Sequence, residues 1–219
     1  MAKKVVFLVA SLRGGGAERV FVTVANELAS RGHQVTLLTW NGDGPNAALL
    51  ASRVRLLDLR LPLEGESYSK SATLRGILKT AKALRGINPD AVFSAPEFIN
   101  LLAVLALTIG RIRARFFPTF HAATSLVSHR RGARIAVLLS RLVAGRATKA
   151  VAVSAGVGKE LVTRGFPRTK VTVIHNPVPA ADGRKTRTYA WDQQLNEMGE
   201  GPIIVTAGRL VPVKDHKTL

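Results

Sequence analysis

The sequence predicts an α/β fold, a doubly wound parallel sheet covered by helices, and two observations support this. Short runs of Val, Leu, Ile and Phe alternate with longer segments in which apolar residues recur every three or four positions, which is the pattern of β-α-β units. Three consecutive glycines join the first such run to the first helical segment, where these sheets often bind ligands. The 219 residues suffice for one large domain, or for one domain and the start of another.

The strands are expected where β-branched and aromatic residues cluster between turn-forming residues. In chain order they are residues 4–10, 34–40, 53–59, 91–94, 115–120, 149–154 and 171–174. Helices are expected where the apolar period is that of an α-helix. They are residues 17–28, 74–84, 97–109, 133–142 and 156–164, the last capped by Ser154. The second helix should bury a stripe made of Leu74, Ile77, Leu78, Ala81 and Leu84.

Regular structure is expected to stop at His175, because two prolines follow within four residues. The sequence therefore predicts a first, Rossmann-like domain over residues 1–176 and an interdomain linker with a helix over residues 177–200. Residues 201–219 have the pattern of a first strand and its loop in a second domain. Because one strand cannot form a core alone, this interpretation treats the chain as truncated.

Composition and charge limit the kinds of site. The chain has no cysteine, which excludes disulfides and thiolate metal sites, and its five histidines lack the spacing of a preformed metal site. The longest apolar run is too short to span a bilayer. The formal net charge is +18, and no acidic residue lies between Phe98 and Lys159. Such a field attracts phosphates, nucleic acid or anionic lipid.

Gly14, Gly15 and Gly16 form the turn between the first strand and the first helix, next to helical N–H groups that face anions. Their lack of side chains would let a phosphate approach the backbone closely. The spacing is neither the GxGxxG dinucleotide fingerprint nor a GxxxxGK phosphate loop. A purely structural turn is therefore the alternative to a binding loop, and Glu18 could serve only to complement the helix dipole.

Three other positions are candidate binding residues. His121 follows the strand 115–120 and should lie at the carboxyl edge of the sheet, where it could bond a sugar or phosphate oxygen or carry a proton. The alternative is a histidine with a local structural bond. Arg209 and Lys214 follow the strand-like run 203–207 and could clamp a diphosphate, although two bases in a loop are more often solvated charges.

The basic segment after His121 predicts an amphipathic helix. On a helix Arg130, Arg134 and Arg141 fall within about 40° of one another. Leucines lie to one side of them, at positions Leu138, Leu139 and Leu142. A basic stripe beside an apolar one suits an acceptor or an anionic membrane surface. A solvated arginine face on a core helix is the alternative.

The order and spacing of several short motifs resemble the retaining glycosyltransferases of family 4, in which two facing Rossmann-like domains form the GT-B arrangement. The resemblance runs along the whole chain. The motifs are GGGAERV from Gly14, RGHQV from Arg31, His121, AVS from Ala152, VIHNPV from Val173, and GRL from Gly208 with Lys214 and Asp215.

This resemblance implies that the first domain holds a glycan or lipid-linked acceptor and the second a UDP- or GDP-linked sugar, without cofactor or metal. It implies that Arg209 and Lys214 bind the diphosphate, that the glycine turn approaches the donor phosphates, and that His121 lies near the transferred sugar. The intact hexosyltransferase would be cytoplasmic, peripheral at the inner face of the cell membrane. The family's paired glutamates would lie beyond Leu219, so this chain alone is expected to be inactive.

Two other classes of function compete with this interpretation. A basic domain that binds nucleic acid or another polyanion would account for the charge. Aromatic residues make up only 5% of the chain, however, and no nucleic-acid-binding motif is recognised. A nicotinamide-dependent oxidoreductase is disfavoured because the dinucleotide fingerprint is missing. No nucleic-acid partner is therefore expected.

Overall fold

The computed structural model describes residues 1–62, 68–122 and 132–178, with only the backbone described for residues 132–138. The chain divides into two units, Met1–Pro177 and Val178–Leu219. Only Pro177 and Val178 of the predicted linker 177–200 are described, and the helix within it and the strand 203–207 lie outside the described residues. The first unit contains every element described below.

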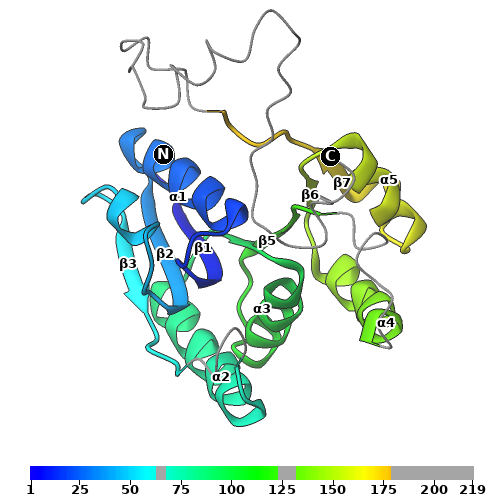
Figure 1. Ribbon diagram of the computed structural model, residues 1–219, viewed down its shortest axis with the longest axis horizontal. Coiled ribbons are helices and arrows are strands. Elements are labelled where there is room, and N and C mark those ends of the chain that lie inside the picture. Colours follow the sequence, from blue (N-terminus) through cyan, green and yellow to red (C-terminus); the bar gives the residue numbers. More distant parts are fainter. Residues whose placement is uncertain (63–67, 123–131, 179–219) are drawn as a thin grey trace, which may run out of the picture. The chain divides into compact units, whose positions relative to one another are not determined.

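Parallel strands form a seven-stranded sheet in the order β3-β2-β1-β4-β5-β6-β7 (Figure 1). The strands are β1 Lys4–Ser11, β2 Gln34–Asn41, β3 Arg55–Asp58, β4 Ala91–Ser94, β5 Arg115–Phe120, β6 Ala150–Ala152 and β7 Val171–Val173. The direction of winding reverses between β1 and β4, so the sheet is doubly wound, as the sequence predicts. Each of the seven strands predicted before His175 exists, but β3, β6 and β7 are shorter than predicted.

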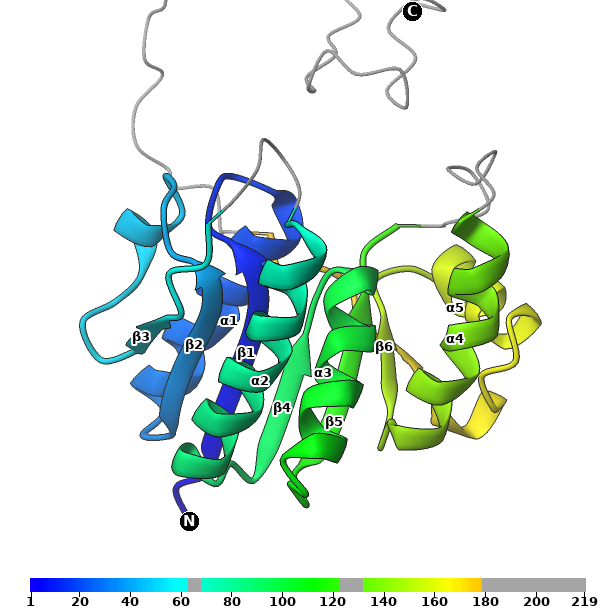
Figure 2. The ribbon, with the colours of Figure 1, turned by 90° about the horizontal axis from the view of Figure 1, so that it is seen from below.

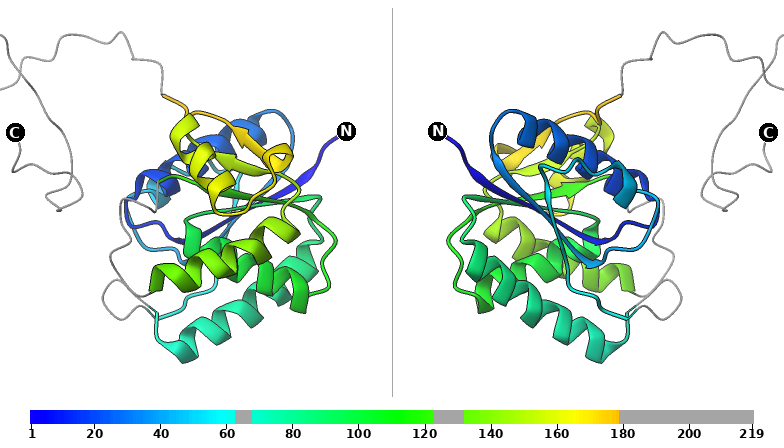
Figure 3. Two further views of the ribbon diagram at one scale, coloured as in Figure 1. Left: turned by 90° about the vertical axis from the view of Figure 1, so that its right-hand side faces the viewer. Right: turned by 90° about the vertical axis from the view of Figure 1, so that its left-hand side faces the viewer.

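The helices are α1 Gly16–Ser30, α2 Lys70–Ile87, α3 Glu97–Ile109, α4 Gly132–Arg146 and α5 Ala155–Thr163. Two short 3-10 helices that the sequence did not predict are η1 Ala47–Leu49 and η3 Arg168–Lys170. Helix α1 lies on one face of the sheet, and α2, α3 and α4 lie on the other (Figure 3). The Ser154 hydroxyl accepts a hydrogen bond from the Val157 N–H, so the predicted cap of α5 is confirmed.

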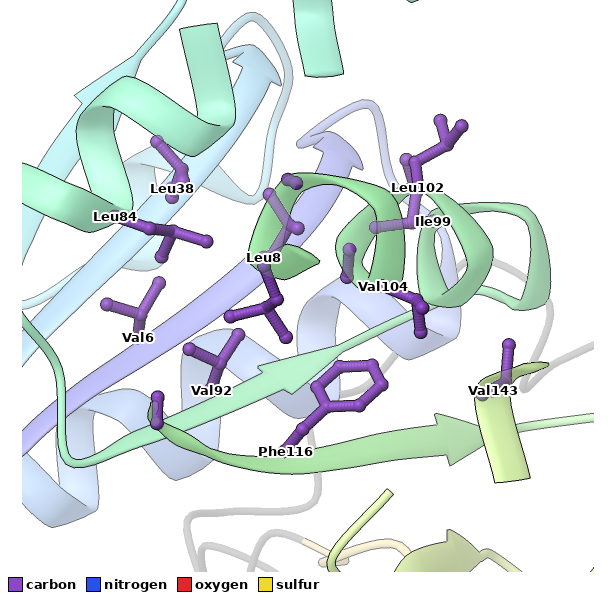
Figure 4. Packing of buried hydrophobic residues seen from close by; sticks show 14 of the residues in the cluster. Val6, Leu8, Leu38, Leu84, Val92, Ile99, Leu102, Val104, Phe116 and Val143 are labelled. Atoms are coloured by element: carbon purple, nitrogen blue, oxygen red, sulfur yellow. The ribbon is translucent and has the colours of Figure 1, made fainter. Parts of the chain in front are cut away.

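Side chains alternate between the two faces of the sheet, which gives two cores. Val6 and Leu8 point toward α2 and α3, where they pack with Val92 and Phe116 of the neighbouring strands (Figure 4). Val5, Phe7 and Val9 belong to the other core, beneath α1. Because both faces are apolar, the strands are nearly continuous hydrophobic runs, as expected for a parallel sheet.

The predicted buried stripe of α2 is partly wrong, because Leu74 and Leu78 are exposed. Ile77, Ala81 and Leu84 are buried as predicted, but the rest of the buried face consists of the smaller residues Ala72, Gly76 and Thr80. A Cβ at Gly76 would lie 2.7 Å from the ring of Trp40, so glycine permits this approach. The Trp40 indole N–H also donates to the Thr80 hydroxyl at 2.9 Å. A count of large apolar residues cannot detect a packing face built from Gly and Thr.

Candidate functional site

The loops that follow β1, β4 and β5 lie at the carboxyl edge of the sheet, where the winding reverses. This is the position of the ligand crevice in doubly wound sheets. The glycine turn follows β1, and His121 follows β5 directly. Since β4 lies between them, two strand spacings, about 10 Å, separate the two features.

The three glycines of the turn have different structural roles. Gly14 has a φ of +109°, a backbone conformation that other residues rarely adopt. Gly15 is the N-cap residue of α1, and because it has no side chain, it cannot make a side-chain capping bond. A Cβ at Gly16 would meet nothing within 4 Å among the described residues, so its surroundings are open. Fold alone therefore demands glycine at Gly14, whereas Gly16 leaves room for a ligand.

Glu18 already places a negative charge at the amino end of α1. Its carboxylate lies in the space that a Cβ at Gly15 would occupy. An anion at this position is favoured by the partial positive charge of the helix end. A phosphate approaching Gly15 would thus compete with a carboxylate of the protein itself, which is a constraint that spacing alone did not reveal.

His121 points away from solvent, into the space between the sheet and α1. Its ring meets the ring of Phe21 edge to face, with 6.1 Å between the centroids. Both ring nitrogens are buried, and neither has a hydrogen-bond partner among the described residues. Burial lowers the pKa of the His121 imidazole, since it disfavours the charged form. Burial therefore favours the neutral imidazole, whose two nitrogens lack a partner in the part of the chain that the structure describes.

A cavity of about 120 Å³ lies against this imidazole. Its walls are mostly apolar and come from β1, α1, β4, β5 and β6. His175, Asn176 and Pro177 close one side of the cavity. The sequence interpretation gave His175 no role, yet the structure places it in the wall of the same cavity as His121. The HNP motif after the last strand was the signal that could have linked the two histidines.

A buried polar network holds the ends of β4 and β5 together. The Ser94 hydroxyl donates to Asn100 Oδ1 at 2.6 Å, and Asn100 Nδ2 donates to the Thr119 carbonyl at 3.0 Å. The Thr119 hydroxyl returns a bond of 2.6 Å to the Ser94 carbonyl. Because Thr119 precedes His121 by two residues, this network positions the strand end from which the imidazole projects. Sequence reasoning did not identify these three residues.

Tyr68 lies at the same edge, near the end of β1. Its hydroxyl donates to the Ala10 carbonyl at 2.7 Å, and its ring meets Trp40 edge to face. Burial raises the pKa of Tyr68 to about 12, with Arg13 opposing this shift and Asp58 adding to it. Tyr68 is thus a neutral hydrogen-bond donor across the physiological range.

Glu97, at the start of α3, is held in an ion pair with Arg164. Glu160 lies 3.8 Å from the same guanidinium. The two carboxylates therefore flank one buried cation, and their charges stabilise the junction of α3 and α5. This arrangement differs from that of retaining glycosidases, in which the two carboxylates flank the scissile bond of the substrate.

The remaining predicted site residues divide into two groups. Arg130, Arg209 and Lys214 lie outside the described residues. Arg134 lies in α4, where only the backbone is described, and Arg141 is exposed on the same helix. In the described part of the chain, no group of three His, Cys, Asp or Glu side chains could hold a metal ion. Nor is any described helix long and apolar enough to cross a membrane.

A larger cavity of about 550 Å³ lies at the opposite, amino edge of the sheet. Lys3, His33, Asp90 and Arg115 are among its lining residues. His33 accepts a hydrogen bond from the Lys3 backbone N–H at 3.2 Å, so its imidazole has a structural partner. Since ligands of doubly wound sheets bind at the carboxyl edge, this cavity is separate from the candidate site.

The structure is thus a doubly wound domain with a cavity beside His121, at the edge where sheets of this class bind ligands. The model of Glycosyltransferase Family 4 matches residues 14–182. This match extends over most of the chain and includes the glycine turn and His121. The chain belongs to Glycosyltransferase Family 4.

Solved structures of GT-B glycosyltransferases have the same fold. A lipopolysaccharide outer core galactosyltransferase, WaaB in its apo form, is 18% identical with a TM-score of 0.62, and the match covers 82% of this chain and 50% of WaaB. Anabaena Alr3699/HepE in complex with UDP is 17% identical with a TM-score of 0.58, covering 80% of this chain and 44% of that protein. No curated protein sequence matches the chain.

The fold is also shared with another class of enzyme. A UDP-N-acetylglucosamine 2-epimerase from Rickettsia bellii is 13% identical with a TM-score of 0.57, covering 90% of this chain and 49% of the epimerase. Such low identities show the fold alone, and one fold can serve several activities. The chain spans about half the length of these solved structures.

Proposed function

We propose that the protein transfers a sugar from a nucleotide sugar to a glycan or lipid-linked acceptor with retention, as a hexosyltransferase. Residues 1–176 would be the acceptor-side domain, residues 177–200 a linker with a helix, and residues 201–219 the start of the donor domain. The observation that carries the proposal is His121, whose two buried nitrogens have no partner in the described part of this family 4 domain.

Unpaired buried polar atoms are costly and usually have a function or a ligand. A neutral imidazole can accept a hydrogen bond at one nitrogen and donate one at the other. His121 would in this way bond hydroxyls of the transferred sugar as they enter the crevice. Desolvation keeps the ring uncharged, so this bonding would persist across the neutral pH range.

The donor phosphates would lie between the glycine turn and the Arg209–Lys214 pair. Backbone N–H groups at the start of α1 and the two cations would stabilise the negative charge that develops on the leaving diphosphate. No metal or other cofactor is needed in this scheme, since Arg and Lys supply the positive charge. Structures of Anabaena Alr3699/HepE hold UDP and UDP-glucose, which supports a UDP-linked donor, with a GDP-linked donor as the other option.

Titration of the intact protein, with its donor domain, with UDP, GDP and UDP-glucose by calorimetry tests the donor site. If each charge-assisted bond contributes about 1.5–3 kcal/mol, Arg209→Ala and Lys214→Ala should each weaken nucleotide binding roughly 10- to 100-fold. Arg31→Ala is the matched control, because Arg31 is exposed and pairs with Glu27 at the far end of α1. Unchanged nucleotide affinity in both site variants would exclude Arg209 and Lys214 as the diphosphate-binding pair.

A second variant tests the glycine turn. Glu18→Gln removes the carboxylate that occupies the phosphate position at Gly15. Nucleotide binding should strengthen, because the competing negative charge is gone. Weaker binding would mean that Glu18 assists the ligand, and no change would mean that the phosphates lie elsewhere.

We further propose that the protein works in the cytoplasm, peripheral at the inner face of the cell membrane. Arg130, Arg134 and Arg141 would then face the acceptor or anionic lipid. Arg141 and its neighbour Leu142 are both exposed on α4, which supports this placement. The alternative function, binding of nucleic acid or another polyanion, is not favoured by the family match.

A further inference from the structure

The solvent-facing side of α3 is apolar, which is unusual for a surface helix. Its outer positions are Phe98, Leu101, Leu105 and Ile109, spaced so that all four share one side of the helix. Phe98, Leu105 and Ile109 are exposed, and Leu101 is half-buried. After Glu97, its first residue, α3 contains no charged residue.

Helix α2 continues this apolar surface. It packs beside α3 on the same face of the sheet (Figure 2). Leu74 and Leu78 lie one turn apart on its outer side. Together with Phe98, Leu105 and Ile109, they have relative exposures from 37% to 58%. A cluster of exposed large apolar side chains on two adjacent helices marks an interaction surface.

Cations border this apolar surface. Helix α2 contains five basic residues and no acidic one: Lys70, Arg75, Lys79, Lys82 and Arg85. The Lys79 ammonium donates to the Leu59 carbonyl on the side away from α3. Arg85 reaches toward the Gly110 carbonyl at the end of α3. Lys79 therefore borders the α2 side of this apolar surface, and Arg85 borders it at the end of α3.

Acidic residues are nearly absent from this face. Glu97 is the one carboxylate in α2, α3 and α4, and it is bound by Arg164. Arg111 and Arg113 follow α3 and are exposed, and Arg141 is exposed on α4, which packs on the other side of α3. A protein partner that covered this face would need both carboxylates and an apolar surface. A bilayer with anionic lipids offers negatively charged phosphates and an apolar layer at once.

We propose that the outer surface of α2 and α3 docks on a membrane that contains anionic lipids. The apolar side chains would enter the interface between headgroups and acyl chains, and the flanking Lys and Arg would meet the lipid phosphates. This inference rests on the peripheral location proposed above and moves the main contact from α4 to α2 and α3. The carboxyl edge of the sheet, with His121, would then open along the membrane surface, within reach of a lipid-linked acceptor.

Flotation of the 219-residue protein with phosphatidylcholine vesicles, with and without phosphatidylglycerol, tests the proposal. The protein should float with the anionic vesicles and lose this binding at high salt. Arg75→Gln and Lys82→Gln should each weaken the partition coefficient about five-fold, and the pair about 25-fold. Phe98→Gln and Ile109→Gln should each weaken it about five-fold through lost burial of apolar surface.

Matched controls separate this surface from general charge or hydrophobicity. Val162→Gln removes an exposed apolar side chain on α5, and Arg31→Gln removes an exposed cation on α1. Both controls should float as the wild type does. The proposal would be overturned by any of three results: the control variants lose as much vesicle binding as the site variants, the protein binds neutral vesicles equally well, or only Arg141→Gln loses binding. Self-association without flotation would assign the face to a second copy of the chain instead.

Nucleotide titration of the same variants, made in the intact protein, distinguishes this proposal from the proposed function. The α2 and α3 variants should bind UDP as the wild type does, because their side chains lie outside the crevice. Arg209→Ala should float normally. If the protein binds nucleotide but does not float with vesicles, only the docking surface is refuted. If it floats but does not bind nucleotide, only the donor site is refuted. Thermal unfolding checks that these surface variants remain folded, since exposed substitutions rarely change stability by more than about 0.5 kcal/mol.

Discussion

Asn100→Ala tests whether the polar network under the crevice stabilises the domain. Asn100 is fully buried, accepts from the Ser94 hydroxyl and donates to the Thr119 carbonyl. The substitution removes two hydrogen bonds and leaves buried groups without partners, which should cost about 2–4 kcal/mol. For a domain of this size, about 3 kcal/mol corresponds to a fall of roughly 6–12 °C in the unfolding temperature.

Differential scanning calorimetry measures this change, with Thr108→Ala as the control on the same helix. Among the described residues, the Thr108 hydroxyl bonds only the Val104 carbonyl one turn earlier, and Thr108 is exposed. Its loss should therefore change the free energy of unfolding by less than about 0.5 kcal/mol. If Asn100→Ala costs less than about 1 kcal/mol, the network does not hold β4 and β5 together. The position of His121 would then need another explanation.

Three further predictions follow from the same edge of the sheet. Burial lowers the pKa of His121 in the folded state below its unfolded value of about 6.5. The unfolded state therefore binds the proton more readily, and the free energy of unfolding should fall as the pH drops below that value. The urea midpoint of His121→Leu should depend less on pH than that of the wild type, and equal slopes would contradict the shift. Gly14→Ala should lower the free energy of unfolding by about 1 kcal/mol or more, because Gly14 has a positive φ, whereas Gly16→Ala should change it by less than about 0.5 kcal/mol. Equal effects of the two substitutions on thermal unfolding would show that position 14 does not require glycine. The Tyr68 phenol should titrate near pH 12 in an ultraviolet titration, and titration near its usual pH would mean that the ring is solvated. Tyr68→Phe should lower the free energy of unfolding by about 1 kcal/mol, because the hydrogen bond to the Ala10 carbonyl is lost.

Much of the architecture follows from the sequence because hydrophobic period is a local property. The bounds predicted for the strands 91–94 and 115–120 and for the helix 97–109 agree with β4, β5 and α3. The capping bond of Ser154 was likewise predictable, since it joins residues three apart. The short 3-10 helices were not, because single turns carry no period.

Packing faces were harder to predict where small residues make the contact. Helix α2 meets the sheet through Gly76 and Thr80, so a pattern built on leucines gave the wrong orientation for Leu74 and Leu78. The same packing leaves the two leucines exposed. The surface proposed for membrane docking therefore could not be found by counting apolar residues along the chain.

By itself, the sequence determined the order of strands and helices, the doubly wound class and the placement of the glycine turn and His121 after their strands. Only the tertiary structure decided that the imidazole faces a cavity shared with His175, that the Glu18 carboxylate lies over Gly15, and that Asn100 ties β4 to β5. The physical reason is that hydrophobic period and turn chemistry act between near neighbours. The direction, burial and pKa of a side chain are set by residues that only folding brings together.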